Sequence, residues 1–223
     1  MTAFSSLISK TLTNDLKWRE SELSFLFKQL ISTNPGSTQE QALLRANLTM
    51  IYAHYEGFCK FALGEYIDAL EKLKLKRIQL KWKLATFSMT SFHKELLNET
   101  NQADFFTKLF NEFDLHINEV ATYSRPEQIS NLWPDLLASW LNKLDLDDKC
   151  VNDEHVTLEA LVTHRNQIAH GKKLTVSNRG ELIKYSKAAT LAMHQVAVGI
   201  VDALDRQSYR RHSLVHTILG HSI

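Results

Sequence analysis

Apolar residues recur every three or four positions along much of the chain, which is the spacing of one face of an α-helix. The longest such stripe opens after Ser37 or Thr38, runs for about 30 residues and predicts a central bundle helix. Its members are Leu44, Leu48, Ile51, Tyr55, Phe58, Ala62, Tyr66 and Leu70. A polar stripe follows the same spacing at an offset and consists of Arg45, Thr49, Tyr52, Glu56 and Lys60. The polar stripe is either a solvated flank, with a weak Glu56–Lys60 pair, or one wall of a site.

Shorter stripes predict further helices on both sides of this one. The expected ranges are 14–32 with Asn14 as N-cap, 126–144, a helix that starts at His155 or Thr157, and 178–209. Residues 91–120 read as shorter helical pieces, and their apolar cluster is expected in the core. That cluster consists of Phe105, Phe106, Leu109, Phe110 and Phe113. Residues 145–154 are acidic but lack the ligand ladder of a calcium loop, so a solvated loop is expected.

Composition supports an all-α fold. Seven glycines and three prolines in 223 residues leave few turns, which favours long helices over many short strands. The length suits one large domain or two small ones, and we expect a single domain over residues 1–223. Within it we expect a helical N-terminal part (1–36), a core (about 40–205) and a C-terminal tail (210–223).

Charge and cysteine content limit the class of protein. The net charge of +1 gives no broad basic field, so any contact with RNA must be local. The two cysteines form no disulfide or metal-binding pattern, which is usual in a reducing compartment. With no signal-like start and no apolar run of about 18 residues, we expect a soluble, cytoplasmic protein that does not bind membranes.

Two other features of the sequence are candidate binding sites. Residues 72–84 are the most basic run, and Lys81 and Lys83 flank Trp82, so this segment could contact a phosphate backbone and stack a base. A solvated helix end is the competing interpretation. In the tail, His212 and His216 stand four residues apart without an acidic third ligand, so we expect no metal site and no cofactor.

The chemistry of the chain is concentrated in residues 161–171, which read LVTHRNQIAHG. Gly171 follows the last periodic position, so it is expected to cap a helix and to leave His170 in the final turn, where the helix dipole favours a cation. Asn166 and His170 share a face, whereas Arg165 lies about 140° from His170. The two can meet only if the last turn loosens, if the arginine side chain curls round, or if a second copy of the motif approaches.

An imidazole and a guanidinium together suit phosphoryl transfer. Histidine exchanges protons near neutral pH, and arginine binds phosphate oxygens in a fork geometry. In RNA the 2′-hydroxyl can attack its own phosphodiester, so the protein needs only a base, an acid and a cation. The competing interpretation is structural: Arg165 pairs with an acid of a neighbouring helix, and His170 merely caps the helix end.

Two motifs resemble those of a known family. The segment RNQIAHG, with four residues between Arg165 and His170, resembles the Arg-x4–6-His signature of the HEPN superfamily. Residues 52–60, YAHYEGFCK, resemble a helix of its MAE_28990/MAE_18760-like branch, although Tyr55 stands where tryptophan is common. The resemblance spans residues 40–200. It implies a HEPN-like helical bundle with long central helices and additional short helices inserted in the middle.

The resemblance also implies a function. HEPN ribonucleases cut RNA without a metal, commonly as toxins or antiviral effectors, so this chain would be an endoribonuclease whose site is shared in a homodimer. Such toxins can have a neutralising antitoxin or another partner protein. The implied catalytic residues are Arg165, Asn166 and His170. If the polar stripe is one wall of the site, Arg45, Tyr52 and Glu56 lie around them. Weaker candidates for RNA contacts are Lys81 and Lys83 of the basic run and Lys172 and Lys173 after the motif.

The HEPN superfamily also includes proteins with other functions. A non-catalytic HEPN-like module that dimerises or binds a partner protein or RNA is the alternative function. A third class consists of HEPN toxins that are inactivated by nucleotidylation, and these usually carry a tyrosine two residues after the motif histidine. Lys172 stands at that position here, which argues against this class.

Overall fold

The computed structural model of the protein describes residues 3–172, 176 and 178–211. In this part of the chain the regular elements are α-helices and two short 3-10 helices, joined by turns and two isolated β-bridges. The elements are α1 (Ala3–Ile31), α2 (Thr38–Lys72), η1 (Arg77–Gln79), α3 (Trp82–Ser88), α4 (Thr90–Leu97), α5 (Gln102–Asn118), η2 (Pro126–Gln128), α6 (Pro134–Lys143), α7 (Lys149–Asp153), α8 (His155–Ala169) and α9 (Arg179–Asp205). The all-α prediction is confirmed.

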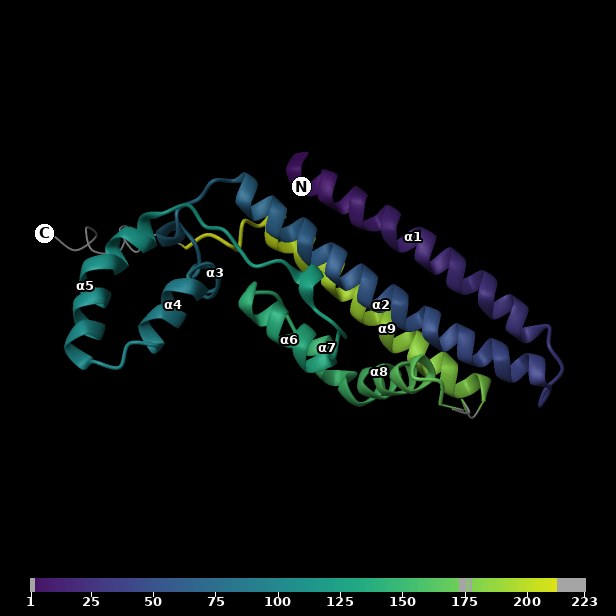
Figure 1. Cartoon of the computed structure of the whole chain (residues 1–223). Helices are drawn as coiled ribbons and strands as arrows, with labels where there is room; N and C mark the ends of the chain where they lie inside the picture. The colour runs from purple at the N-terminus through teal and green to yellow at the C-terminus, as the bar shows by residue number, and fades with distance from the viewer. Residues whose placement is uncertain (1–2, 173–175, 177, 212–223) are drawn as a thin grey trace, which may run out of the picture.

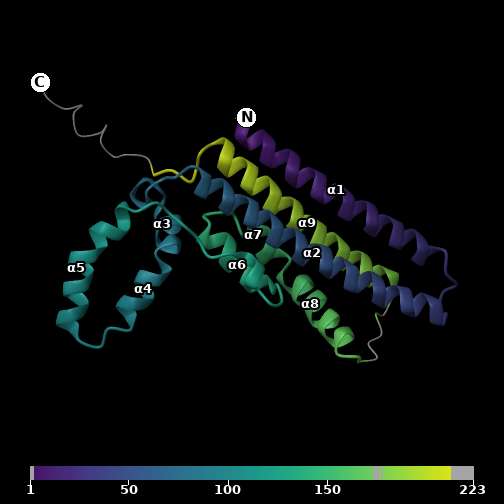
Figure 2. The ribbon, with the colours of Figure 1, turned by 45° about the horizontal axis from the view of Figure 1, so that its top comes forward.

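The three long helices α1, α2 and α9 lie side by side along most of their lengths (Figure 1). Helices α6, α7 and α8 lie along the side of this bundle that faces away from α1, and both views agree on this (Figure 2). Helices α3, α4 and α5 form a lobe at one end, and α3 joins this lobe to the bundle by packing against α6. No helix in the described ranges is long and apolar enough to cross a bilayer.

Helix α2 is the centre of the bundle because it packs against α1, α8 and α9. Every member of its predicted apolar stripe is buried. Its start is also as predicted, since the Ser37 hydroxyl accepts a hydrogen bond from the Glu40 amide at 3.1 Å. The continuous stripe therefore located the core helix correctly.

Two predicted boundaries are wrong, each for a physical reason. Helix α1 starts at Ala3 and not at residue 14, because Ile8 and Leu12 extend its buried stripe, and Asn14 is an exposed residue within the helix. The helix expected from residue 126 starts at Pro134, after the short turn η2. Trp133 has an extended backbone, as the residue before a proline prefers, and this separates the two elements.

The middle of the chain differs most from the prediction. Part of the expected acidic loop forms the short helix α7. The lobe has its own small core, in which Phe105 and Leu109 are partly buried. The other three phenylalanines predicted for the core are exposed, with exposed fractions of 54% for Phe106, 76% for Phe110 and 41% for Phe113. In the described part of the chain, helix α5 packs mainly against two short elements, α4 and η1, and its three exposed phenylalanines lie outside the lobe's small core.

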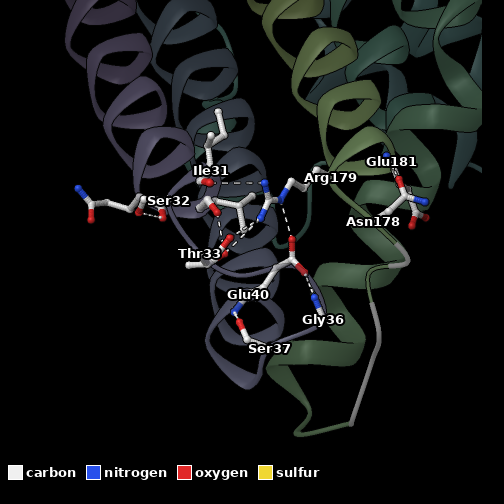
Figure 3. A network of polar contacts seen from close by, with 11 residues as sticks. Ile31, Ser32, Thr33, Gly36, Ser37, Glu40, Asn178, Arg179 and Glu181 are labelled. Atoms are coloured by element: carbon white, nitrogen blue, oxygen red, sulfur yellow. Dashed lines mark hydrogen bonds and ion pairs between the residues drawn. The ribbon is translucent and has the colours of Figure 1, made fainter.

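A polar cluster ties the start of α9 to the turn between α1 and α2 (Figure 3). The Arg179 Nε donates to Glu40 Oε1 at 2.6 Å, and its Nη2 donates to the Thr33 carbonyl at 2.9 Å. The second oxygen of Glu40 accepts from the Gly36 amide at 2.7 Å. Because α9 follows α8 after a short connector, this cluster also fixes where that connector ends.

This cluster should make stability depend on pH. The Gly36 amide, assisted by Arg179, lowers the pKa of the Glu40 carboxyl below its ordinary value. A lowered folded-state pKa stabilises the fold above the ordinary value of about 4.3, and the contribution is lost as pH falls through the lower folded value. We expect Glu40→Gln to melt below wild type at pH 7 and the gap to close on acidification, measured by thermal unfolding from pH 7 to 3. Exposed Glu159→Gln is the control; a gap that stays constant with pH would contradict the assignment.

Candidate functional site

Helix α8 carries the motif and is held by its apolar face. Leu158, Leu161 and Val162 are fully buried, and the helix packs against both α2 and α9. The same side of α8 continues along the helix toward its C-terminal end, where it meets α2 and the residue 129–132 segment. Arg165 and Asn166, both half-buried, lie on that side.

The C-terminal end of α8 is a Schellman cap. Gly171 has φ +73°, its amide donates to the Ile168 carbonyl at 3.0 Å, and the Lys172 amide donates to the Gln167 carbonyl at 3.0 Å. The predicted glycine cap is therefore confirmed. His170 is the residue immediately before the glycine, and its side chain is exposed at the end of the helix.

Arg165 is held by residues from three parts of the chain. Its guanidinium carbon lies 4.3 Å from the centre of the Tyr52 ring on α2. Its Nη1 donates to Asn131 Oδ1 at 2.9 Å and to Asn166 Oδ1 at 2.8 Å. Its Nη2 lies 3.9 Å from Glu56 Oε2. The arginine is thus oriented mainly by two neutral amides and an aromatic face, with a carboxylate at the limit of ion pairing.

The Glu56 carboxylate has a closer cationic partner than Arg165. Its Oε1 lies 2.6 Å from the Lys60 Nζ, which confirms the pair expected from the sequence. Lys60 also donates to the Ile129 carbonyl and so reaches across to the segment that carries Asn131. Two cations share one carboxylate, which leaves this group of side chains with a net positive charge.

Tyr52 connects the same parts of the site. Its side chain is fully buried, and its hydroxyl accepts a hydrogen bond from the Leu132 amide at 3.0 Å. Burial, and next a hydrogen bond to Glu56, raise the pKa of Tyr52 well above the ordinary tyrosine value. The protonated phenol donates to Glu56 and accepts from the Leu132 amide, which fixes the segment next to Asn131.

The YAHYEGFCK motif serves two faces of α2. Tyr52, Glu56 and Lys60 face the Arg165 site, whereas His54 and Gly57 face α1. The His54 Nε2 lies 2.8 Å from Glu22 Oε2, and a Cβ on Gly57 would lie 2.9 Å from Arg19 Nη1. The glycine therefore leaves room for an arginine of α1 to lie against α2.

The structure brings together Arg165, Asn166, Tyr52 and Glu56, the arrangement expected if the polar stripe forms one wall of a site. Asn131 was missed, because it lies 34 residues before Arg165 in a range expected to be helical, and no local pattern marks it. For Arg45, no side-chain contact with this group is found among the described residues. Arg165 and His170 likewise make no contact with each other in the described part of one chain, in agreement with their predicted separation around the helix.

The predicted RNA-binding lysines lie in different places. The Nζ atoms of Lys81 and Lys83 lie 2.8 Å and 3.7 Å from Asp145 carboxylate oxygens. Helix α3, which follows Lys81, is at the opposite end of the bundle from the end of α8 (Figures 1 and 2). Lys172 is exposed directly after the glycine cap. Lys173 and the tail histidines His212, His216 and His221 lie outside the described residues.

Under the ribonuclease activity that the resemblance implies, Glu56→Gln should lower the rate of RNA cleavage without unfolding the protein. The substitution keeps the shape of the side chain but removes the charge that orients Lys60 and the Tyr52 hydroxyl next to Arg165, and the loss of such supporting groups commonly reduces activity about 10- to 100-fold. Initial cleavage rates and melting temperatures would be compared with those of Glu159→Gln, an exposed position on the same helix as Arg165. Full activity would show that Glu56 is only a flank residue.

The architecture and the motif together define a class. A bundle of long helices, with an Arg-x4-His motif at the capped end of a docked helix, is the arrangement expected of a HEPN-type domain. The family described as HEPN_MAE_28990/-like HEPN matches residues 8–209, and the chain belongs to it. HEPN domains are commonly ribonucleases. No curated protein and no solved structure matches the chain.

Proposed function

We propose that this protein is a metal-independent endoribonuclease that cleaves RNA by attack of the 2′-hydroxyl on the adjacent phosphodiester. The observation that carries the proposal is that Arg165 is held in place but keeps its positive charge. Two amide oxygens orient its guanidinium without neutralising it, and the nearby carboxylate of Glu56 is engaged by Lys60. A cation held in this way can stabilise the charge that develops on a phosphorane.

In the proposed mechanism each motif residue has one role. His170 takes the proton from the 2′-hydroxyl, and Arg165 binds the non-bridging oxygens as negative charge develops on them. The side-chain oxygen of Asn166 accepts from Arg165, so its amide nitrogen is the group that could donate to a phosphate oxygen. His170 is exposed, so it can contact RNA directly. The ammonium group of the exposed Lys172 would add a contact to the phosphate backbone of the RNA.

The leaving 5′-oxygen needs an acid, and we propose that a second copy of the chain supplies it. A two-fold axis near the Gly171 caps would bring two His170 side chains to one phosphodiester and would supply a second Arg165. The biological role that the resemblance suggests is that of a toxin or antiviral effector, which a neutralising antitoxin or partner protein could restrain.

The test is incubation of purified protein with total RNA in EDTA, together with the Arg165→Ala and His170→Ala variants and the Glu159→Gln control. Cleavage by wild type and by the control, with loss in both motif variants at unchanged melting temperature, is the expected result. Equal cleavage by all four proteins would point to a contaminating nuclease and would overturn the proposal.

One observation favours the alternative function, a non-catalytic module that binds a partner. Phe106, Phe110 and Phe113 expose apolar surface on α5, and such surface is common where another protein docks. This alternative predicts no cleavage by wild type, together with a partner whose binding is lost in Phe110→Ser but retained in Arg165→Ala.

A further inference from the structure

We propose that Asn131 is a positioning residue that holds Arg165 in place while leaving its charge available to a phosphodiester anion. The inference rests on the proposed function, because it concerns how the same site accepts its substrate. It assigns a role to a residue outside both sequence motifs.

The first step is geometric. Nη1 of a guanidinium carries two hydrogens, and in this site one is donated to Asn131 at 2.9 Å and the other to Asn166 at 2.8 Å. Asn166 belongs to the same helix as Arg165, so its contact alone leaves the arginine free to swing together with its neighbour. Asn131 comes from a different segment and therefore fixes the guanidinium relative to α2 and the Tyr52 ring.

The second step concerns the anchoring of Asn131 itself. The backbone is bound to α2 two residues before Asn131 and one residue after it. Lys60 donates to the Ile129 carbonyl, and the Leu132 amide donates to the Tyr52 hydroxyl. These contacts hold the backbone before and after residue 131. The Asn131 side chain is thus presented from a fixed backbone, as a positioning residue requires.

The third step is electrostatic. A carboxylate at position 131 would bind the guanidinium more strongly than an amide does, because a charge-assisted hydrogen bond is about twice as strong as a neutral one. It would also neutralise the cation, and a substrate phosphate would then have to compete with it. An amide oxygen orients the arginine without this competition. The neutral side chain at position 131 therefore favours an anionic ligand.

A carboxylate at position 131 should therefore have opposite effects on stability and on function. If the Asn131 hydrogen bond were purely structural, the two would change together. We expect Asn131→Asp to melt at or above the wild-type temperature, while kcat/KM for RNA falls about 10- to 100-fold, the usual effect of losing a supporting group. Asn131→Ala should also lower kcat/KM, because it frees the arginine. The matched control is Asn142→Asp on α6, an exposed asparagine outside the site.

Binding is measured separately from cleavage, with a short RNA that is 2′-O-methylated throughout and cannot be cut by the proposed chemistry. Wild type should bind it more tightly than Arg165→Ala and Asn131→Asp do. If wild type binds in this way but cleaves no RNA, the positioning inference stands and the proposed catalysis fails. Wild-type kcat/KM and wild-type RNA binding in Asn131→Asp would overturn the inference. If that variant does not fold, the same two wild-type values in Asn131→Ala would overturn it.

Discussion

A mixed dimer of one wild-type chain and one His170→Ala chain is expected to cleave RNA about a hundredfold more slowly than wild type, the usual effect of losing one general acid or base. The reaction needs a base on the 2′-oxygen and an acid on the 5′-oxygen, yet each motif provides a single exposed histidine at the end of α8. His164, the nearest histidine in the sequence, has its Nδ1 3.0 Å from the Tyr185 hydroxyl of α9. It is therefore engaged away from the end of the helix.

Hybrid dimers would be formed from two differently tagged chains, purified through both tags and assayed at a concentration where they do not exchange. The matched control is a hybrid with Glu159→Gln, which should keep the full rate. Two independent sites would leave the His170→Ala hybrid with about half the wild-type rate. A hybrid at half activity, or a wild-type monomer that cleaves RNA, would rule out the shared site.

RNA that carries a single 2′-O-methyl group at the scissile nucleotide is expected to remain intact. The methyl group removes the only hydroxyl that can attack the phosphodiester in the proposed chemistry, so the effect should be close to complete. The unmodified RNA should yield products with a 2′,3′-cyclic phosphate, or the monophosphates that follow its hydrolysis, in the presence of EDTA.

The readout is separation of end-labelled fragments, with product ends identified by mass spectrometry. A methyl group placed one nucleotide away from the scissile position is the control for altered binding, and this RNA should still be cut. Cleavage of the first substrate at the normal rate would show that water or a protein side chain is the nucleophile. The roles proposed for His170 and Arg165 would then have to be revised.

The amino-acid sequence by itself determined the elements that depend on local pattern. The stripe of α2, the Ser37 cap, the start of α8 and the Gly171 cap follow from helical periodicity and from capping preferences, which act over a few residues. The two motifs, Arg165 to His170 and Tyr52 to Lys60, were also evident from the sequence. Their residue types and spacing carry the chemistry directly.

Only the tertiary structure decided which residues meet. Asn131 joins Arg165 because the chain returns to α2 before α6, a contact over 34 positions that no local pattern encodes. The exposure of Phe110 was likewise decided by what packs against α5, because the same amphipathic stripe suits a core helix or one with a solvent-exposed apolar face. Arg45 shares the spacing of Glu56, but only Glu56 reaches the arginine, since spacing fixes the face of a helix and not the depth along it.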